Sequence, residues 1–164
     1  MMTTATKALK YIHIPTEHAR GFQHGQVDSN GQVPERVSEG GGPCRHCLQP
    51  IQPHEEMLII GYRPFPSPQP YAETGPIFLH AKECEPYTDI SVLPAMFSDA
   101  HETLMIVRGY NHNDRIEYGA TAVVAANQLD KSCKNLLMNE EVAYLHIRFA
   151  PTNCYQFRVE RGSI

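Results

Sequence analysis

The sequence has no apolar run that approaches the roughly 18 residues needed to cross a membrane as a helix. Residues 1–10 contain two lysines and a few small residues but no apolar core of the kind found in secretory signals. Positive charge is also sparse: 14 basic residues are scattered among 18 acidic ones, and the net charge is −4. Because no basic stripe is present to neutralise phosphates, we expect no binding to nucleic acid. The missing signal and the missing membrane span lead us to expect a globular protein in the cytoplasm that does not bind membranes.

Motifs that would identify a reaction are also missing. His101-Glu102 lacks the second histidine of a metalloprotease helix, and Gly40-Gly41-Gly42 neither follows a predicted strand nor opens a helix, as a phosphate-binding loop must. The sequence has no internal repeats, and 164 residues can bury a hydrophobic core without disulfides. We therefore expect a single domain spanning residues 1–164.

Short β-rich runs dominate the pattern, and they predict strands at residues 8–14, 55–62, 76–80, 103–110, 115–124, 142–149 and 154–160. The last four form two hairpins, because the connecting residues 111–114 and 151–153 favour turns. One clear amphipathic helix is predicted, since four apolar side chains recur at helical spacing, namely Leu129, Cys133, Leu136 and Leu137. Together these elements indicate an α+β fold with a mainly antiparallel sheet and helices on one face.

Two long segments rich in glycine or proline flank the middle of the chain. Residues 28–43 are polar, show no apolar period and end in Gly40-Gly41-Gly42-Pro43, so we expect a mobile loop. Residues 64–76 hold several prolines and predict an extended but structured loop. Both lie near a Cys-x-x-Cys pair, the usual sequence of a metal-binding knuckle.

That pair is Cys44 and Cys47, and His80 and Cys84 supply a second pair at the end of a predicted strand. Five cysteines without an export signal indicate free thiols or thiolate ligands, not a disulfide framework. If the chain turns helically after the strand, both pairs can supply four tetrahedral ligands to one zinc ion. We therefore predict a structural zinc site, in which His46 could substitute for one ligand; the alternative is that these side chains are ordinary core residues.

Three catalytic interpretations compete with a structural metal. Pro43-Cys44 to Cys47 matches half of the zinc nucleobase deaminase signature, but the required His-x-Glu does not precede it, and His54-Glu55-Glu56 follows it instead. A redox dithiol would need a helix after the pair, and Pro50 and Pro53 come too soon. A catalytic zinc could use nearby carboxylates as bases, namely Glu55, Glu56 or Glu83.

The order of several short segments resembles a known family. They are Pro43-Cys44-Arg45, Glu56-Met57-Leu58, Pro70-Tyr71, the run from Gly75 to Ala81, Arg108-Gly109-Tyr110, Met138-Asn139, the run from Val142 to His146, and Asn153-Cys154-Tyr155. The chain is similar, over nearly its whole length, to the bacterial family called Domain of Unknown Function 1203. The resemblance implies one domain in a bacterial cytoplasm and carries no established activity.

The same resemblance points to Cys44, Arg45 and Cys154 as the more regular family features, so the zinc site would be a local addition. Asn153 stands where the family pattern has glycine, and asparagine tolerates the left-handed conformation that the turn needs. We expect a zinc-binding, non-catalytic or regulatory binding module, with a protein partner or a homo-oligomer left open. The alternative is a zinc- or thiol-dependent enzyme acting on a small molecule, in a pocket between residues 64–76 and the metal.

Overall fold

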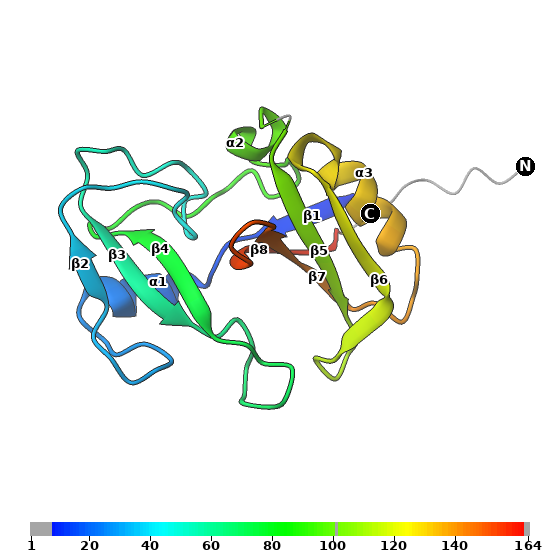
Figure 1. Cartoon of the computed structure of the whole chain (residues 1–164), viewed down its shortest axis with the longest axis horizontal. Coiled ribbons are helices and arrows are strands. Elements are labelled where there is room, and N and C mark those ends of the chain that lie inside the picture. The colour runs from blue at the N-terminus through cyan, green and yellow to red at the C-terminus, as the bar shows by residue number, and fades with distance from the viewer. Residues whose placement is uncertain (1–7, 101, 163–164) are drawn as a thin grey trace, which may run out of the picture.

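The computed structural model describes residues 8–100 and 102–162. The strands form two antiparallel sheets, which Figure 1 shows side by side. The larger has five strands in the order β1 (Leu9–Ile12), β8 (Cys154–Arg161), β7 (Tyr144–Phe149), β5 (Leu104–Tyr110) and β6 (Ile116–Ala125). The smaller has β2 (Glu35–Val37), β3 (Met57–Tyr62) and β4 (Gly75–His80). The α+β class is confirmed. His101 and residues 1–7, which include most of the segment considered as a secretory signal, lie outside the described residues.

One face of the larger sheet is covered by the helix that the apolar spacing predicts. This helix, α3 (Leu129–Leu136), follows a short 3₁₀ turn, η1 (Ala126–Gln128). Its Leu129 and Cys133 are completely buried in the same hydrophobic core as Leu145 and Ile147 of β7. Because side chains alternate along a strand, Leu145 and Ile147 share the face of the sheet that α3 covers, and the residues between and beside them point to the opposite face.

The smaller sheet has its own core, closed by a helix that the sequence did not predict. This helix, α1 (Thr16–Gln23), begins directly after Pro15, whose fixed φ suits a helix start. Ala19 and Phe22 are buried in the core of β3 and β4, around Leu58 and Leu79. Only two apolar residues of α1 carry this packing, which is too few to reveal a helical period.

The segment 28–43 differs from the predicted loop, because it contains β2. Glu35 pairs with Ile59 and Val37 with Met57, so backbone hydrogen bonding at the sheet edge holds a strand whose side chains show no apolar alternation. Asp28 fixes the start of the segment by accepting a hydrogen bond from the Gly61 N–H at 2.9 Å. The expected mobility of residues 28–43 stays a prediction.

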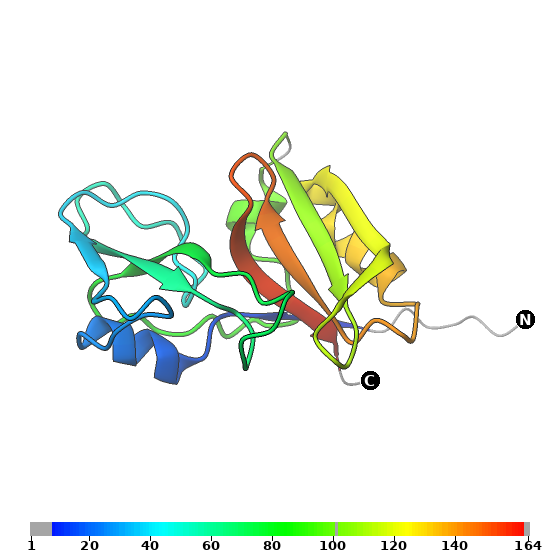
Figure 2. The same cartoon turned by 60° about the horizontal axis from the view of Figure 1, so that its bottom comes forward.

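The proline-rich segment 64–76 packs on the second face of the larger sheet. Phe65 is buried there, with its ring centroid 5.2 Å from that of Tyr110. Glu73 pairs with Arg108 at 3.2 Å and with Arg148 at 3.3 Å. These contacts tie the connection between β3 and β4 to β5 and β7, and Figure 2 shows this connection extending from the smaller sheet toward the larger one.

Candidate metal centre

The first pair of candidate ligands lies on a tight hairpin between Pro43 and Pro50, which form an isolated β-bridge. The Cys44 N–H donates to the Gln49 carbonyl at 3.0 Å, and the Leu48 N–H donates to the Cys44 carbonyl at 3.0 Å. This turn forces Leu48 to a φ of 55°. The turn also directs the backbone N–H groups of Cys47 and Gln49 at the sulfur atoms of Cys44 and Cys47. The hairpin therefore has the tight backbone turn of a knuckle, and it places both cysteines on one short segment.

The second pair lies where β4 ends. His80 is the last residue of that strand, and the chain bends irregularly from there to Cys84 instead of forming the expected helical turn. Two side chains of α1 hold this bend. The Gln23 amide donates to the carbonyls of His80 and Lys82 at 2.9 and 3.0 Å, and Arg20 Nη2 donates to the Cys84 carbonyl at 2.8 Å.

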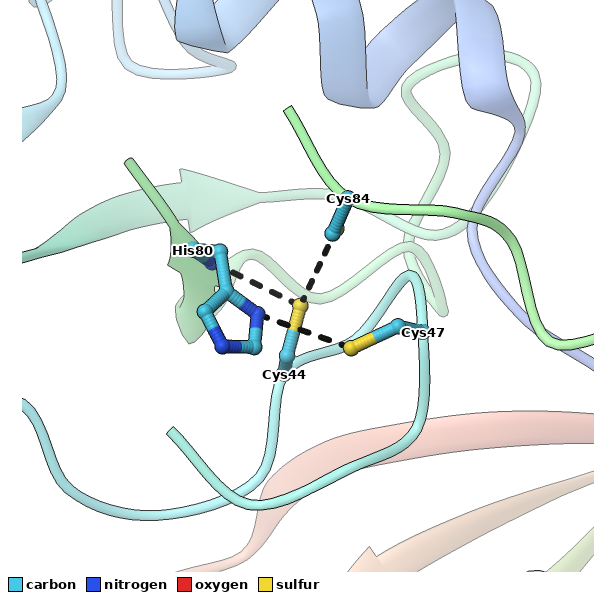
Figure 3. Close-up of side chains that lie close together, drawn as sticks. All are labelled: Cys44, Cys47, His80 and Cys84. Carbon is cyan, nitrogen blue, oxygen red and sulfur yellow. Dashed lines mark hydrogen bonds between the residues drawn. The ribbon is translucent and has the colours of Figure 1, made fainter. Parts of the chain in front are cut away.

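The two pairs meet, as Figure 3 shows. One ligand atom from each of Cys44, Cys47, His80 and Cys84 lies within 4.8 Å of all the others. The Cys44 and Cys84 sulfurs are 3.9 Å apart, and Nδ1 of His80 is 3.5 Å from the Cys47 sulfur. The four side chains thus lie together, and this group of three cysteines and one histidine could hold a metal ion.

His46 lies beside the group but outside it. Its Nδ1 is 3.2 Å from the Cys84 sulfur, and its Nε2 is 2.8 Å from the Thr16 hydroxyl. Burial is the main cause that lowers the pKa of His46, with additional effects from His13 and Arg20. In the tautomer with a proton on Nδ1, that N–H donates to the Cys84 sulfur and Nε2 accepts from Thr16, so that His46 would support a candidate ligand instead of being one.

Hydrogen bonding within the group shifts the pKa values of Cys44 and His80 in opposite directions. Hydrogen bonds from Cys47 and then from Cys84 lower the pKa of Cys44 far below that of a free thiol. Hydrogen bonding with Cys44 and Cys84 raises the pKa of His80 to about 10. Both shifts favour the charged forms of the two side chains, and a metal ion bound there would take the place of the imidazole proton.

The nearby carboxylates divide into one that contacts the group and two that do not. Glu55 Oε1 lies 3.4 Å from Nε2 of His80. Glu56 instead pairs with Arg36 at 2.5 Å, and Glu83 pairs with His24 at 3.0 Å. An open cleft of about 540 Å³ reaches His80 and is lined by Ser38, His54, Glu55, Glu56 and Lys82. The segment 64–76 does not line this cleft.

The residues singled out by the family resemblance also converge. Arg45 follows Cys44 in the knuckle, and its Nε donates to the Tyr155 carbonyl at 2.6 Å, one residue from Cys154. Burial lowers the pKa of Arg45 to about 10, while the neighbouring Cys154 and Cys44 act in the opposite direction. The last hairpin therefore packs beside the knuckle as expected, and Asn153 in its turn has a φ of 62°.

Fold and site together define an α+β protein with a three-cysteine, one-histidine group suited to a metal ion. The chain belongs to the family described as "protein of unknown function (DUF1203)", which matches residues 41–161 and so includes the whole group. Neither the curated proteins nor the solved structures include a match to this chain. Over residues 8–100 and 102–162, no helix combines the length and apolarity needed to span a membrane.

Proposed function

We propose that the protein is a zinc-binding module in which the metal holds the knuckle hairpin to the segment after β4. The observation that carries this proposal is the spacing of the four ligand atoms, which lie within 4.8 Å of one another. Zinc with bonds of about 2.3 Å to sulfur and about 2.0 Å to nitrogen would place tetrahedral ligands about 3.8 Å apart for two sulfurs and about 3.5 Å apart for sulfur and nitrogen. The Cys44 and Cys84 sulfurs are 3.9 Å apart and the Cys47 sulfur is 3.5 Å from Nδ1 of His80, while all the ligand atoms lie within 4.8 Å of one another.

The chemistry of the donor set supports zinc and a closed site. Thiolate and imidazole ligands favour zinc over the oxygen-seeking cations, and four protein ligands leave no coordination position for water or substrate. Three thiolates and a neutral imidazole around a divalent ion carry one net negative charge. Donors around the sulfurs can spread this charge, namely the N–H groups of Cys47, Gln49 and His80 and the imidazole of His46. We infer a structural or regulatory binding role and no catalysis at the metal.

Metal content and stability test the proposal together. Protein purified without chelators is expected to contain about one zinc per chain by elemental mass spectrometry. Cys84→Ala should lose the zinc and unfold at lower denaturant, because the knuckle is no longer joined to the end of β4. Cys154→Ala is the matched control, since Cys154 lies outside the group, and it should retain full metal content. A metal-free chain whose stability does not rise when zinc is added would contradict the proposal.

One observation favours a second candidate, a zinc-dependent enzyme. The open cleft of about 540 Å³ reaches His80, and Glu55 touches the ring of that candidate ligand. If His80 left the metal, a bound water would face the cleft with Glu55 beside it as a base. X-ray absorption spectroscopy of the zinc protein separates the two. Three sulfur neighbours together with the outer-shell scattering of one imidazole support the structural site, whereas three sulfurs and a light atom without imidazole scattering support the enzyme.

A further inference from the structure

A second cleft, of about 510 Å³, lies between the knuckle hairpin and the β7–β8 turn and is separate from the one that reaches His80. Its walls are mainly apolar and come from both sheets and from α2 (Ala95–Ser98), including Pro43, Phe78, Met96, Phe97, Met105 and Phe149. A mostly apolar cleft of this volume with a few fixed polar groups is typical of a small-molecule site. Two of its polar groups, Arg45 and Gln156, indicate which chemistry it accepts.

Arg45 brings a positive charge to the cleft. The residue is only 2% exposed, and no described carboxylate forms an ion pair with it. Its Nε and Nη1 donate to the backbone carbonyls of Tyr155 and Pro43, which uses two of the five N–H donors of a guanidinium. The Phe78 ring, 5.5 Å from the guanidinium carbon, and the nearby cysteines offset part of the cost of burying this charge, and an anionic group in the cleft would add a charge-assisted pair.

Gln156 brings an acceptor that has no donor. Its side-chain Nε2 donates to the Cys154 carbonyl at 3.1 Å, but Oε1 is buried and has no hydrogen-bond partner. The residue occupies a β-bulge, because Ile147 pairs with Phe157 while Arg148 pairs with Tyr155. Bulges redirect side chains, and because Gln156 lines the cleft, a ligand with an O–H or N–H group could supply the donor that its Oε1 lacks.

We propose that this cleft binds a small apolar carboxylic acid that also carries a hydroxyl or N–H donor. The carboxylate would pair with Arg45, the donor would bond to Gln156 Oε1, and the apolar body would lie against Met96, Phe97 and Phe149. The site uses none of the four metal-binding side chains. It therefore goes beyond the zinc module and can be tested on the zinc-containing chain.

The probe is phenyllactate, compared with phenylpropionate, which lacks the hydroxyl, and phenylpropanol, which lacks the carboxylate. Isothermal titration calorimetry of the zinc-loaded full chain is expected to show that phenyllactate binds about tenfold more tightly than phenylpropionate or phenylpropanol. A tenfold difference in affinity corresponds to the loss of one hydrogen bond or more. Gln156→Met should abolish the preference for phenyllactate over phenylpropionate while leaving phenylpropionate binding nearly unchanged. Gln128→Met, a glutamine substitution at an exposed position outside the cleft, should change neither affinity.

Arg45→Lys provides a second test, because lysine keeps the positive charge but lacks the planar guanidinium that binds a carboxylate through two parallel N–H groups. It should weaken both acids about tenfold or more and leave phenylpropanol unaffected. If the variant loses zinc but keeps its affinity for the acids, Arg45 serves the metal group and the proposal is wrong. Equal binding of phenyllactate and phenylpropionate to the unsubstituted chain, or no binding of any probe at millimolar concentration, would also overturn it.

Discussion

At the scale of single residues, Leu48 combines two features that are seldom found together. Its φ of 55° lies in the left-handed region, where a branched L-residue pays roughly 1–2 kcal/mol. Its side chain is nevertheless only 1% exposed and packs in the core of the larger sheet. The knuckle turn imposes the backbone conformation, and burial of the leucine side chain offsets its cost.

Two substitutions at Leu48 separate these effects. Leu48→Ala loses the core contacts and keeps the strain, so it should lower the free energy of unfolding by about 3 kcal/mol. Leu48→Gly loses the same contacts but relieves the strain, and we expect it to be about 1 kcal/mol more stable than the alanine variant. Urea unfolding followed by circular dichroism gives both values. A glycine variant less stable than the alanine variant would show that the turn stores no strain at this position.

The four candidate ligands could be predicted from the sequence, whereas the hydrogen-bond partners of the neighbouring His46 could not. Cys44 and Cys47 share a knuckle spacing, and the chemistry of zinc demands soft ligands in a set of four, so His80 and Cys84 complete a recognisable pattern. The contact between Thr16 and His46 joins residues 30 positions apart. A threonine hydroxyl in an unrecognised helix carries no signal of such a role, since its partner is chosen entirely by tertiary packing.

At the scale of elements, the sequence predicted strands better than helices. β5, β6, β7 and β8 have runs of β-branched and aromatic residues, and tight turns join them into pairs. α1 was missed because only Ala19 and Phe22 form its apolar face, and β2 was missed because its pairing is made by the backbone. Local sequence therefore reveals an element only when that element buries a regular row of its own side chains.

Gly109 provides a test of how closely two strands must approach. It lies in β5 at a register shift between Arg108 and Tyr110. A Cβ built there would lie 2.8 Å from the Ala120 carbonyl oxygen of β6 and 2.9 Å from the Ala120 Cβ. Because backbone cannot easily move within a five-stranded sheet, Gly109→Ala should cost about 1–3 kcal/mol of stability.

Gly119 is the matched control for this substitution. It lies in the neighbouring strand β6, and a Cβ there would meet nothing within 4 Å. Gly119→Ala should therefore leave the thermal midpoint unchanged or raise it slightly, because alanine restricts the unfolded chain. Thermal unfolding of the pair by calorimetry checks this. Equal effects of the two substitutions would mean that β5 and β6 separate without cost at the register shift.

At the scale of the whole molecule, the knuckle hairpin contributes side chains to two hydrophobic cores. Leu48 packs in the core of the larger sheet, whereas Cys44 and Ile51 pack in the core of the smaller one. Arg45 adds a hydrogen bond to the Tyr155 carbonyl in β8. Figure 2 shows this hairpin and β4 on the side of the smaller sheet that faces β8. The candidate metal site lies on the smaller sheet and its connections, so metal binding should act mainly on that half of the molecule.

Removal of the metal tests this division of stability. Excess chelator should abolish a contribution of about 4 kcal/mol, if free zinc had been present at about a thousand times its dissociation constant. Hydrogen exchange monitored by mass spectrometry should then show faster exchange in residues 44–51, 77–84 and α1, because these segments lose their common anchor. The amides of β7 and β8 should keep their protection, since α3 and the larger core hold them independently of the metal. Zinc, but not magnesium, should restore the original exchange. A uniform loss of protection across both sheets would mean that the two cores unfold as one cooperative unit, with the knuckle transmitting the effect through Leu48.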